Sequence, residues 1–174
     1  MQATKIIGGS ALLLCALSAP FLVVPAIHKI PWMTTPLHVV NMAIKKAGPG
    51  AKRKWVDLGS GDGRIVLAAG KHGYAAAGYE LNPVLVGMSY GATAYHYREL
   101  RGRGGRVSFH RSDFWQCSLV DVNVVSCFGI APVMDQLAAK MVKESAVGTK
   151  LVCFRFYPKP PLPRGLHQVY ADRK

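Results

Sequence analysis

From Trp55 onward, short apolar runs alternate with longer segments of helical periodicity, and this alternation limits the folds open to the chain. The apolar runs predict five strands and a short sixth, at 54–59, 74–80, 106–113, 121–129, 150–157 and about 167–171. Helices are expected between them, at 62–72, 82–101 and 132–147. Repeated strand–helix–strand units form mostly parallel sheets with helices on both faces. The sequence therefore predicts an α/β fold.

The loop between the first strand and the first helix contains the sequence VDLGSGDGR, residues 56–64. In an open α/β sheet ligands bind at the carboxyl ends of the strands, so this loop lies where a site is expected. A P-loop is excluded because no Gly-Lys-Ser/Thr follows the first glycine at the required spacing. A dinucleotide fingerprint is disfavoured, because Arg64 replaces its third glycine and Asp57 interrupts an apolar strand. A turn with only a structural role stays open.

Acidic residues mark the ends of three successive predicted strands. Asp57 precedes the first glycine, and Glu80 ends the second strand nineteen residues after Gly61. Asp113 ends the third strand. A lone acid at a strand end is usually solvated, but three at matching positions indicate one shared ligand site.

The chemistry of S-adenosylmethionine fits these acids. Its sulfonium and ammonium are cationic and it has no pyrophosphate, so Asp57 would attract it rather than repel it. A carboxylate at Glu80 can accept hydrogen bonds from ribose hydroxyls. Asp113 and the following Phe114 suit adenine, as an acceptor for its amine and a contact for its face. These residues predict a methyl-donor site.

With DLGSGDGR, GYELNP and SDFW in this order, the chain resembles the seven-β-strand (class I) methyltransferases. More narrowly, it resembles the small mitochondrial protein-lysine methyltransferases, which modify the c subunit of ATP synthase or the adenine nucleotide translocase. The segment FGIAPVM, residues 128–134, is closer to the ATP synthase member. The resemblance covers almost the whole chain. It implies a Rossmann-like sheet whose C-terminal hairpin is shortened here, because the chain ends soon after the fifth strand.

The resemblance also implies roles for individual residues. The donor's methionine part would be surrounded by a group at the first loop: Asp57, Gly59, Ser60 and Gly61. Glu80 would bind the ribose, Asn82 would line the same pocket, and Asp113 with Phe114 would bind adenine. The methyl group and the incoming lysine would face the loop that holds Phe128, Gly129 and Pro132. That loop lacks the Asn/Asp-Pro-Pro-Tyr/Phe motif of enzymes that methylate adenine or amide nitrogens. No general base is evident, so transfer would depend on alignment of a neutral amine.

The first 56 residues contain no acid, and 6–27 contain no charge at all. As a helix, 6–27 would be about 33 Å long, close to the hydrocarbon thickness of a bilayer. Basic, acid-poor N-termini are typical of mitochondrial import. We therefore expect residues 1–30 to be a membrane anchor and targeting segment. A cleaved signal peptide and a buried core helix are the alternatives.

Residues 31–50 are expected to be an amphipathic connector to a methyltransferase domain at 51–174. Its helix would have Pro36 in the first turn and Gly48 at its end. The apolar face would consist of Leu37, Val40, Ile44 and Ala47. We expect this helix to lie across the entrance of the domain or on the membrane surface.

The net charge of +13 favours an acidic partner, either nucleic acid or an anionic membrane. Residues 98–106, RELRGRGGR, are a candidate nucleic-acid patch, so an RNA methyltransferase stays as an alternative. A donor-binding module without catalysis is another. The four cysteines have no metal-binding spacing and are expected to be reduced and buried. The favoured interpretation is a lysine methyltransferase of the mitochondrial inner membrane, facing the matrix. It would bind S-adenosylmethionine, lipid and a membrane-protein substrate, with neither metal nor nucleic acid.

Overall fold

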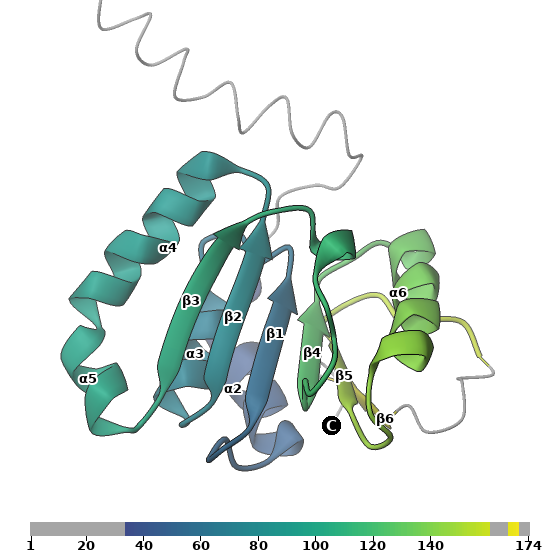
Figure 1. The fold of residues 1–174 in the computed structure, drawn as a ribbon, viewed down its shortest axis with the longest axis horizontal. Helices are drawn as coiled ribbons and strands as arrows, with labels where there is room; N and C mark the ends of the chain where they lie inside the picture. The colour runs from purple at the N-terminus through teal and green to yellow at the C-terminus, as the bar shows by residue number, and fades with distance from the viewer. Residues whose placement is uncertain (1–33, 161–166, 171–174) are drawn as a thin grey trace, which may run out of the picture.

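A computed structural model of the chain describes residues 34–160 and 167–170. Within them a sheet has the strand order β3-β2-β1-β4-β5-β6, with every neighbouring pair parallel (Figure 1). The strands are β1 Lys54–Leu58, β2 Ala75–Glu80, β3 Arg106–Arg111, β4 Val124–Cys127, β5 Lys150–Cys153 and β6 His167–Tyr170. The chain reverses direction across the sheet between β3 and β4, which places a switch point beside β1. The mostly parallel sheet is the one that the sequence predicts.

Helices cover both faces of the sheet. They are α2 Leu37–Ala47, α3 Arg64–Lys71, α4 Pro83–Tyr95, α5 Tyr97–Gly102 and α6 Ala131–Glu144, with a short 3-10 helix, η1, at Phe114–Gln116. One hydrophobic cluster joins α2, α3 and α4 to one face, with Trp55 and Val124 from the strands. A second cluster joins α6 to the other face through Met134 and Leu137. Figure 1 shows α2 and α3 behind the strands and α6 in front. Alternate strand residues face the two clusters, as strand geometry requires.

The predicted helix 82–101 is two helices, because the chain breaks at His96. His96 has φ −94° and ψ 8°, and it ends α4 and precedes α5. The change of direction brings Leu100 into the core, where it is 4% exposed. Helical periodicity alone did not predict this break. The other predicted helices differ from the structure only at their ends.

Helix α2 belongs to the core of the described unit. Its buried residues are Val40, Ala43, Ile44 and Ala47, whereas Leu37 is 57% exposed. Pro36 directly precedes the helix, and Gly48 ends it with φ 95°. The apolar face of α2 packs against α3 and the sheet, and the expected position of this helix across the entrance or on the membrane surface stays a prediction. The domain boundary at residue 51 stays a prediction.

The predicted membrane anchor, residues 1–30, lies outside the described residues. Among the helices of the described part, none combines the length and apolar character that a membrane span requires. After β5 the described residues contain β6, which pairs with β5 in parallel. Within those residues, then, the fifth strand is followed by a parallel strand rather than by a hairpin.

Candidate functional site

The glycine loop leaves the carboxyl end of β1 and turns sharply into α3. Gly59, Gly61 and Gly63 have φ angles of 75°, 55° and 79°. Side chains with a Cβ avoid this left-handed region, which explains a glycine at every second position. The backbone amides of Gly59 and Ser60 both donate to the carbonyl of Tyr79, at 2.9 and 3.0 Å. The loop is thus held against the end of β2.

Glu80 fastens the same loop from the end of β2. The Gly61 amide donates to its Oε2 at 3.0 Å, and the Asn82 amide donates to its Oε1 at 2.9 Å. A carboxylate oxygen can accept two hydrogen bonds, so each keeps capacity for a ligand hydroxyl. The residue predicted to bind ribose therefore also shapes the glycine loop between β1 and α3, residues 59–63, which we call the donor loop.

Asp57 lies at the centre of the site and is 1% exposed. Its neighbours across the sheet are Gly78 on β2 and Ser126 on β4. Ser126 Oγ donates to Asp57 Oδ1 at 2.6 Å, and Trp55 Nε1 donates to Ser126 Oγ at 2.8 Å. This defines the Trp55–Ser126–Asp57 chain of hydrogen bonds.

Burial raises the pKa of Asp57 from 3.8 to about 7, and the nearby charges of Glu80 and Asp62 act in the same direction. The hydrogen bond from Ser126 acts against them by favouring the ionised form. A cationic ligand would relieve the cost of ionising this carboxyl group. The electrostatics of the site therefore favour a positively charged partner.

Two buried side-chain oxygens at the loop have no hydrogen-bond partner among the described residues: Asp57 Oδ2 and Ser60 Oγ. Buried polar atoms are normally paired, so unpaired ones at a loop indicate a ligand. Ser60 fits because Gly78 has no side chain; a Cβ there would lie 2.6 Å from Ser60 Oγ. The residues present thus fit a ligand with donor groups and positive charge, as the methionine part of S-adenosylmethionine has.

The other predicted donor residues lie along the same edge of the sheet. Asn82 is 2% exposed, and its Oδ1 accepts from the Val84 amide at 2.9 Å, which caps α4. Asp113 Oδ1 accepts from the Trp115 amide at 3.0 Å and caps η1. Phe114 packs beside Trp115, with ring centroids 4.8 Å apart. Their structural roles are clear, and their contacts to a ligand stay a prediction.

The loops after β4 and β5 form an aromatic rim at this edge. Phe128 meets Phe156 edge to face, with ring centroids 6.5 Å apart. Gly129 is buried; a Cβ there would lie 3.0 Å from Met134 and from Val133. Pro132 is exposed in the first turn of α6. This rim lies where the acceptor was predicted.

Arg64 fastens the chain before α2 to the donor loop. Its Nη2 forms an ion pair with Asp62 at 2.6 Å, and its Nη1 donates to the carbonyl of Thr35 at 3.3 Å. Thr35 is itself 5% exposed. The start of the described chain therefore lies beside the candidate site.

The described part of the chain contains no group of His, Cys, Asp and Glu that could hold a metal ion. Cys117, Cys127 and Cys153 are buried, as the sequence predicts. Burial raises the pKa of the Cys117 thiol to about 11, so it stays protonated at neutral pH. The fourth cysteine, Cys15, lies outside the described residues.

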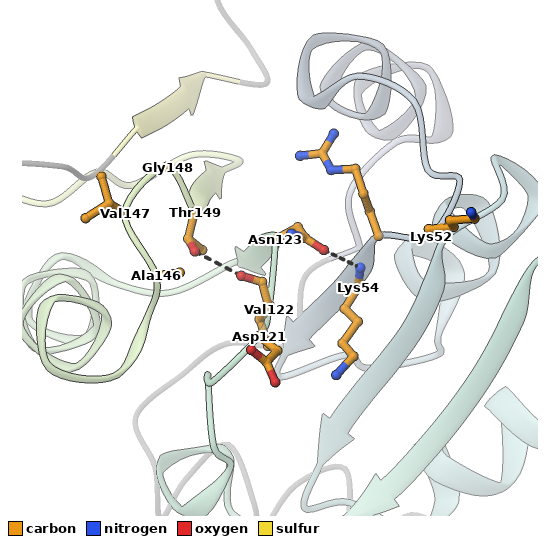
Figure 2. A pocket seen from close by; sticks show the side chains of 10 residues that line it. Lys52, Lys54, Asp121, Val122, Asn123, Ala146, Val147, Gly148 and Thr149 are labelled. Carbon is orange, nitrogen blue, oxygen red and sulfur yellow. Dashed lines mark hydrogen bonds between the residues drawn. The ribbon is translucent and has the colours of Figure 1, made fainter.

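An open cavity of about 450 Å³ lies away from this site, at the amino ends of β1, β4 and β5 (Figure 2). It is lined by segments 52–54, 121–123 and 146–149. The donor loop, Glu80 and Asp113 are not among its lining residues. We therefore attach no part of the site to it.

Sequence reasoning missed Trp55, Ser126 and Gly78. Ser126 sits in the apolar segment VVSC, and a hydroxyl in a strand that is otherwise buried was the one available signal. Its partner Asp57 is 69 residues away in sequence. Only the order of the strands brings the two together.

A parallel sheet with a glycine loop and a buried acid at the end of β1 defines the Rossmann-like methyltransferase class. Among solved structures, the chain is similar to an RNA methyltransferase from Salinibacter ruber in complex with S-adenosyl-L-homocysteine. The TM-score is 0.63 and the identity 28%, over 71% of this chain and 78% of that one. The ribosomal protein L11 methylase of Lactobacillus delbrueckii shares the fold. It is 12% identical, with a TM-score of 0.55 over 68% of this chain and 58% of that one.

More narrowly, the chain belongs to the ANTKMT methyltransferase domain family, whose model matches residues 57–160. The ATP synthase c-subunit lysine N-methyltransferase of Mus musculus is 38% identical over 92% of this chain, and that of Homo sapiens 35% over 88%. The adenine nucleotide translocase lysine N-methyltransferase of Mus musculus is 41% identical over 80%. The chain spans 62%, 64% and 57% of the lengths of these three relatives.

Proposed function

We propose that this protein transfers methyl groups from S-adenosylmethionine to a lysine of a mitochondrial inner-membrane protein, with the c subunit of ATP synthase as first candidate. The observation that carries the donor assignment is Asp57: a buried carboxyl group with one unpartnered oxygen at a glycine loop. The acceptor assignment is supported by relatives named for the c subunit, at 35–38% identity.

The methionine, ribose and adenine parts of S-adenosylmethionine would lie side by side along the carboxyl ends of the strands. Asp57, Ser60 and the backbone of Gly59 and Gly61 would hold the methionine part, and Glu80 would accept from the ribose. Asp113 and Phe114 would hold adenine, and Asn82, whose Oδ1 accepts from the Val84 amide at the start of α4, would line the same pocket as the ribose. When bound, S-adenosylmethionine supplies an electrophilic methyl group on a sulfonium. The chain's own residues bind it, orient it and exclude water.

The acceptor lysine must be neutral to attack. Deprotonating a lysine with a pKa near 10.4 costs roughly 4–5 kcal/mol at neutral pH. The rim of Phe128, Phe156 and the half-buried Tyr157 would desolvate the amine, and a desolvated ammonium has a lowered pKa. Catalysis would then come from alignment of the amine with the methyl group. The loop with Gly129 and Pro132 would set that alignment.

The expected location is the inner membrane with the domain in the matrix. Its support is the uncharged segment 6–27, the basic N-terminus and the names of the relatives. Anchoring enzyme and substrate in one bilayer raises their effective concentration without new contacts.

The test is deletion of the gene, followed by intact-mass measurement of membrane proteins. Loss of a methyl mass on the c subunit is expected, restored by the wild-type chain and not by Asp57→Ala or Glu80→Ala. Loss only on the adenine nucleotide translocase would instead select that substrate, to which the 41% identical relative points. No change on either protein would refute both.

An RNA substrate is the second candidate, because the solved neighbour at 28% identity is an RNA methyltransferase. Purified chain and labelled S-adenosylmethionine would be added to mitochondrial extract. Label in a protease-resistant, ribonuclease-sensitive fraction would support RNA, and label in a protease-sensitive fraction supports the lysine reaction.

A further inference from the structure

Helix α4 is uncharged along its whole length, PVLVGMSYGATAY, yet half of it faces solvent. Its buried residues are Leu85, Val86 and Ser89. On the exposed side Met88 is 49% exposed and Tyr95 is 85% exposed. Gly87 and Gly91 have open space where a side chain would be. A soluble helix normally exposes charged residues on this side, so the exposed apolar face needs an explanation.

Arginines lie on the elements that follow or contact α4. Helix α5 continues from α4, and α4 packs along β3 at the edge of the sheet (Figure 1). Three exposed arginines, on α5 and on the face of β3 that α4 covers, have no ion-pair partner among the described residues: Arg98, Arg101 and Arg111. Glu99, the one acid of α5, is already paired with Lys71 at 2.8 Å. We call Met88, Tyr95 and these three arginines the arginine–tyrosine surface.

We propose that the arginine–tyrosine surface docks on a bilayer that contains anionic phospholipids. The arginines would contact lipid phosphates, and Met88 and Tyr95 would lie at the boundary between headgroups and acyl chains. An apolar face beside a basic one is the pattern of segments that lie in the membrane interface. Each basic residue near an anionic surface adds about 1 kcal/mol to binding. This inference is independent of the methyl-transfer reaction.

The apolar side chain of Met88 favours lipid over RNA as the partner. Bases stack on ring faces, and in this surface Tyr95 alone offers a ring, which meets His96 edge to face with centroids 4.9 Å apart. Tyr90 packs on Phe109 in the same way, and its hydroxyl donates to the Phe109 carbonyl at 2.8 Å. Arginines on an edge strand also discourage strand pairing, yet that role does not need Met88 and Tyr95 exposed on a neighbouring helix.

The test uses the full chain and two kinds of vesicle, phosphatidylcholine alone and phosphatidylcholine with phosphatidylglycerol. Segment 6–27 is uncharged, so its contribution to binding is common to both vesicles and cancels in the ratio of the two partition coefficients. Arg98→Gln with Arg101→Gln should weaken partitioning to the anionic vesicles about 10- to 30-fold and leave the zwitterionic vesicles unchanged. The matched control, Lys45→Gln with Lys143→Gln, removes two exposed charges elsewhere and should have little effect.

A second pair tests the apolar part. Met88→Ser with Tyr95→Ser should weaken binding to both vesicles by about tenfold, while thermal unfolding shows that each variant is folded. The proposal is overturned if the wild type partitions equally to both vesicles, or if the lysine control loses as much as the arginine pair. It is also overturned if the arginine pair abolishes binding of mitochondrial RNA and leaves vesicle binding unchanged, which would assign the surface to RNA.

Discussion

Asp57 is a buried acid whose ionisation lowers the stability of the donor-free protein. Its pKa is 3.8 in an ordinary setting and about 7 in the fold. Between those pH values the folded chain keeps a proton that the unfolded chain has lost, so this residue makes stability fall as pH rises. Asp57→Asn should therefore raise the free energy of unfolding of the donor-free protein at pH 8, by about 1–3 kcal/mol, and change it less at pH 5. Denaturant unfolding at the two pH values measures this, and equal destabilisation at both would contradict the account.

Ser126 sets the pH at which Asp57 becomes available to a cation. Affinity for S-adenosylmethionine should rise as pH increases through about 7, because the ionised carboxylate would be the binding form under the proposed function. Ser126→Ala removes a hydrogen bond to that charge, worth about 1.5 kcal/mol or more, and should move the midpoint up by about one pH unit. Ser126→Cys keeps a weak donor and should move it less. Calorimetric dissociation constants between pH 6 and 9 measure both, and an unmoved midpoint in Ser126→Ala would rule out this role.

At the scale of elements, the contact between β2 and the donor loop depends on Gly78. In Gly78→Ala the new methyl would lie 2.6 Å from Ser60 Oγ and 2.9 Å from Val66. The loop must shift, so we expect at least a tenfold loss of donor affinity and about 1–3 kcal/mol of stability. Gly87→Ala on α4 has open space and should instead stabilise the protein by up to about 1 kcal/mol. Calorimetry measures the donor affinity of the two variants, and chemical denaturation measures their free energy of unfolding. Similar losses in Gly78→Ala and Gly87→Ala would refute the argument.

Helix α2 tests where the folded unit begins. Ile44 is 1% exposed and Leu37 is 57% exposed, on the same helix. If α2 belongs to the cooperative core, Ile44→Ala should cost about 2–4 kcal/mol in denaturant unfolding, and Leu37→Ala well under about 1 kcal/mol. Equal small effects would show that α2 unfolds separately from the sheet.

Periodicity and glycine positions predicted the strands, most of the helices and the acids at the strand ends, whereas the contact of those acids with a donor stays a prediction. Asp57, Glu80 and Asp113 could be found because parallel strands end at one edge, and a strand end is visible in sequence. Ser126 and Gly78 could not, since their importance depends on register with β1 across the sheet. The break at His96 and the exposed position of Leu37 depend on packing, which a helical pattern does not encode.

At the scale of the whole molecule, Arg64 decides where the N-terminal segment meets the domain. Its bond to the Thr35 carbonyl places that junction at the donor loop rather than at the far end of the sheet. Between the uncharged segment 6–27 and the first described residue lie only residues 28–33. A short connection of this kind restricts what the site can reach.

The length of this connection limits how far the candidate site can lie from the membrane. Even fully extended, six or seven residues span at most about 25 Å. If residues 6–27 are held in a bilayer and the chain methylates lysine as proposed, only lysines near the membrane surface would come within its reach. Inserting a flexible Gly-Ser stretch after Lys29 should lower the rate on such a lysine and extend activity to lysines farther from the bilayer. Mass spectrometry of the methylated sites would measure both effects. An unchanged set of sites would exclude a limit on reach set by the length of the connection. Substrate choice would then be a matter of distance from the membrane as much as of sequence around the lysine.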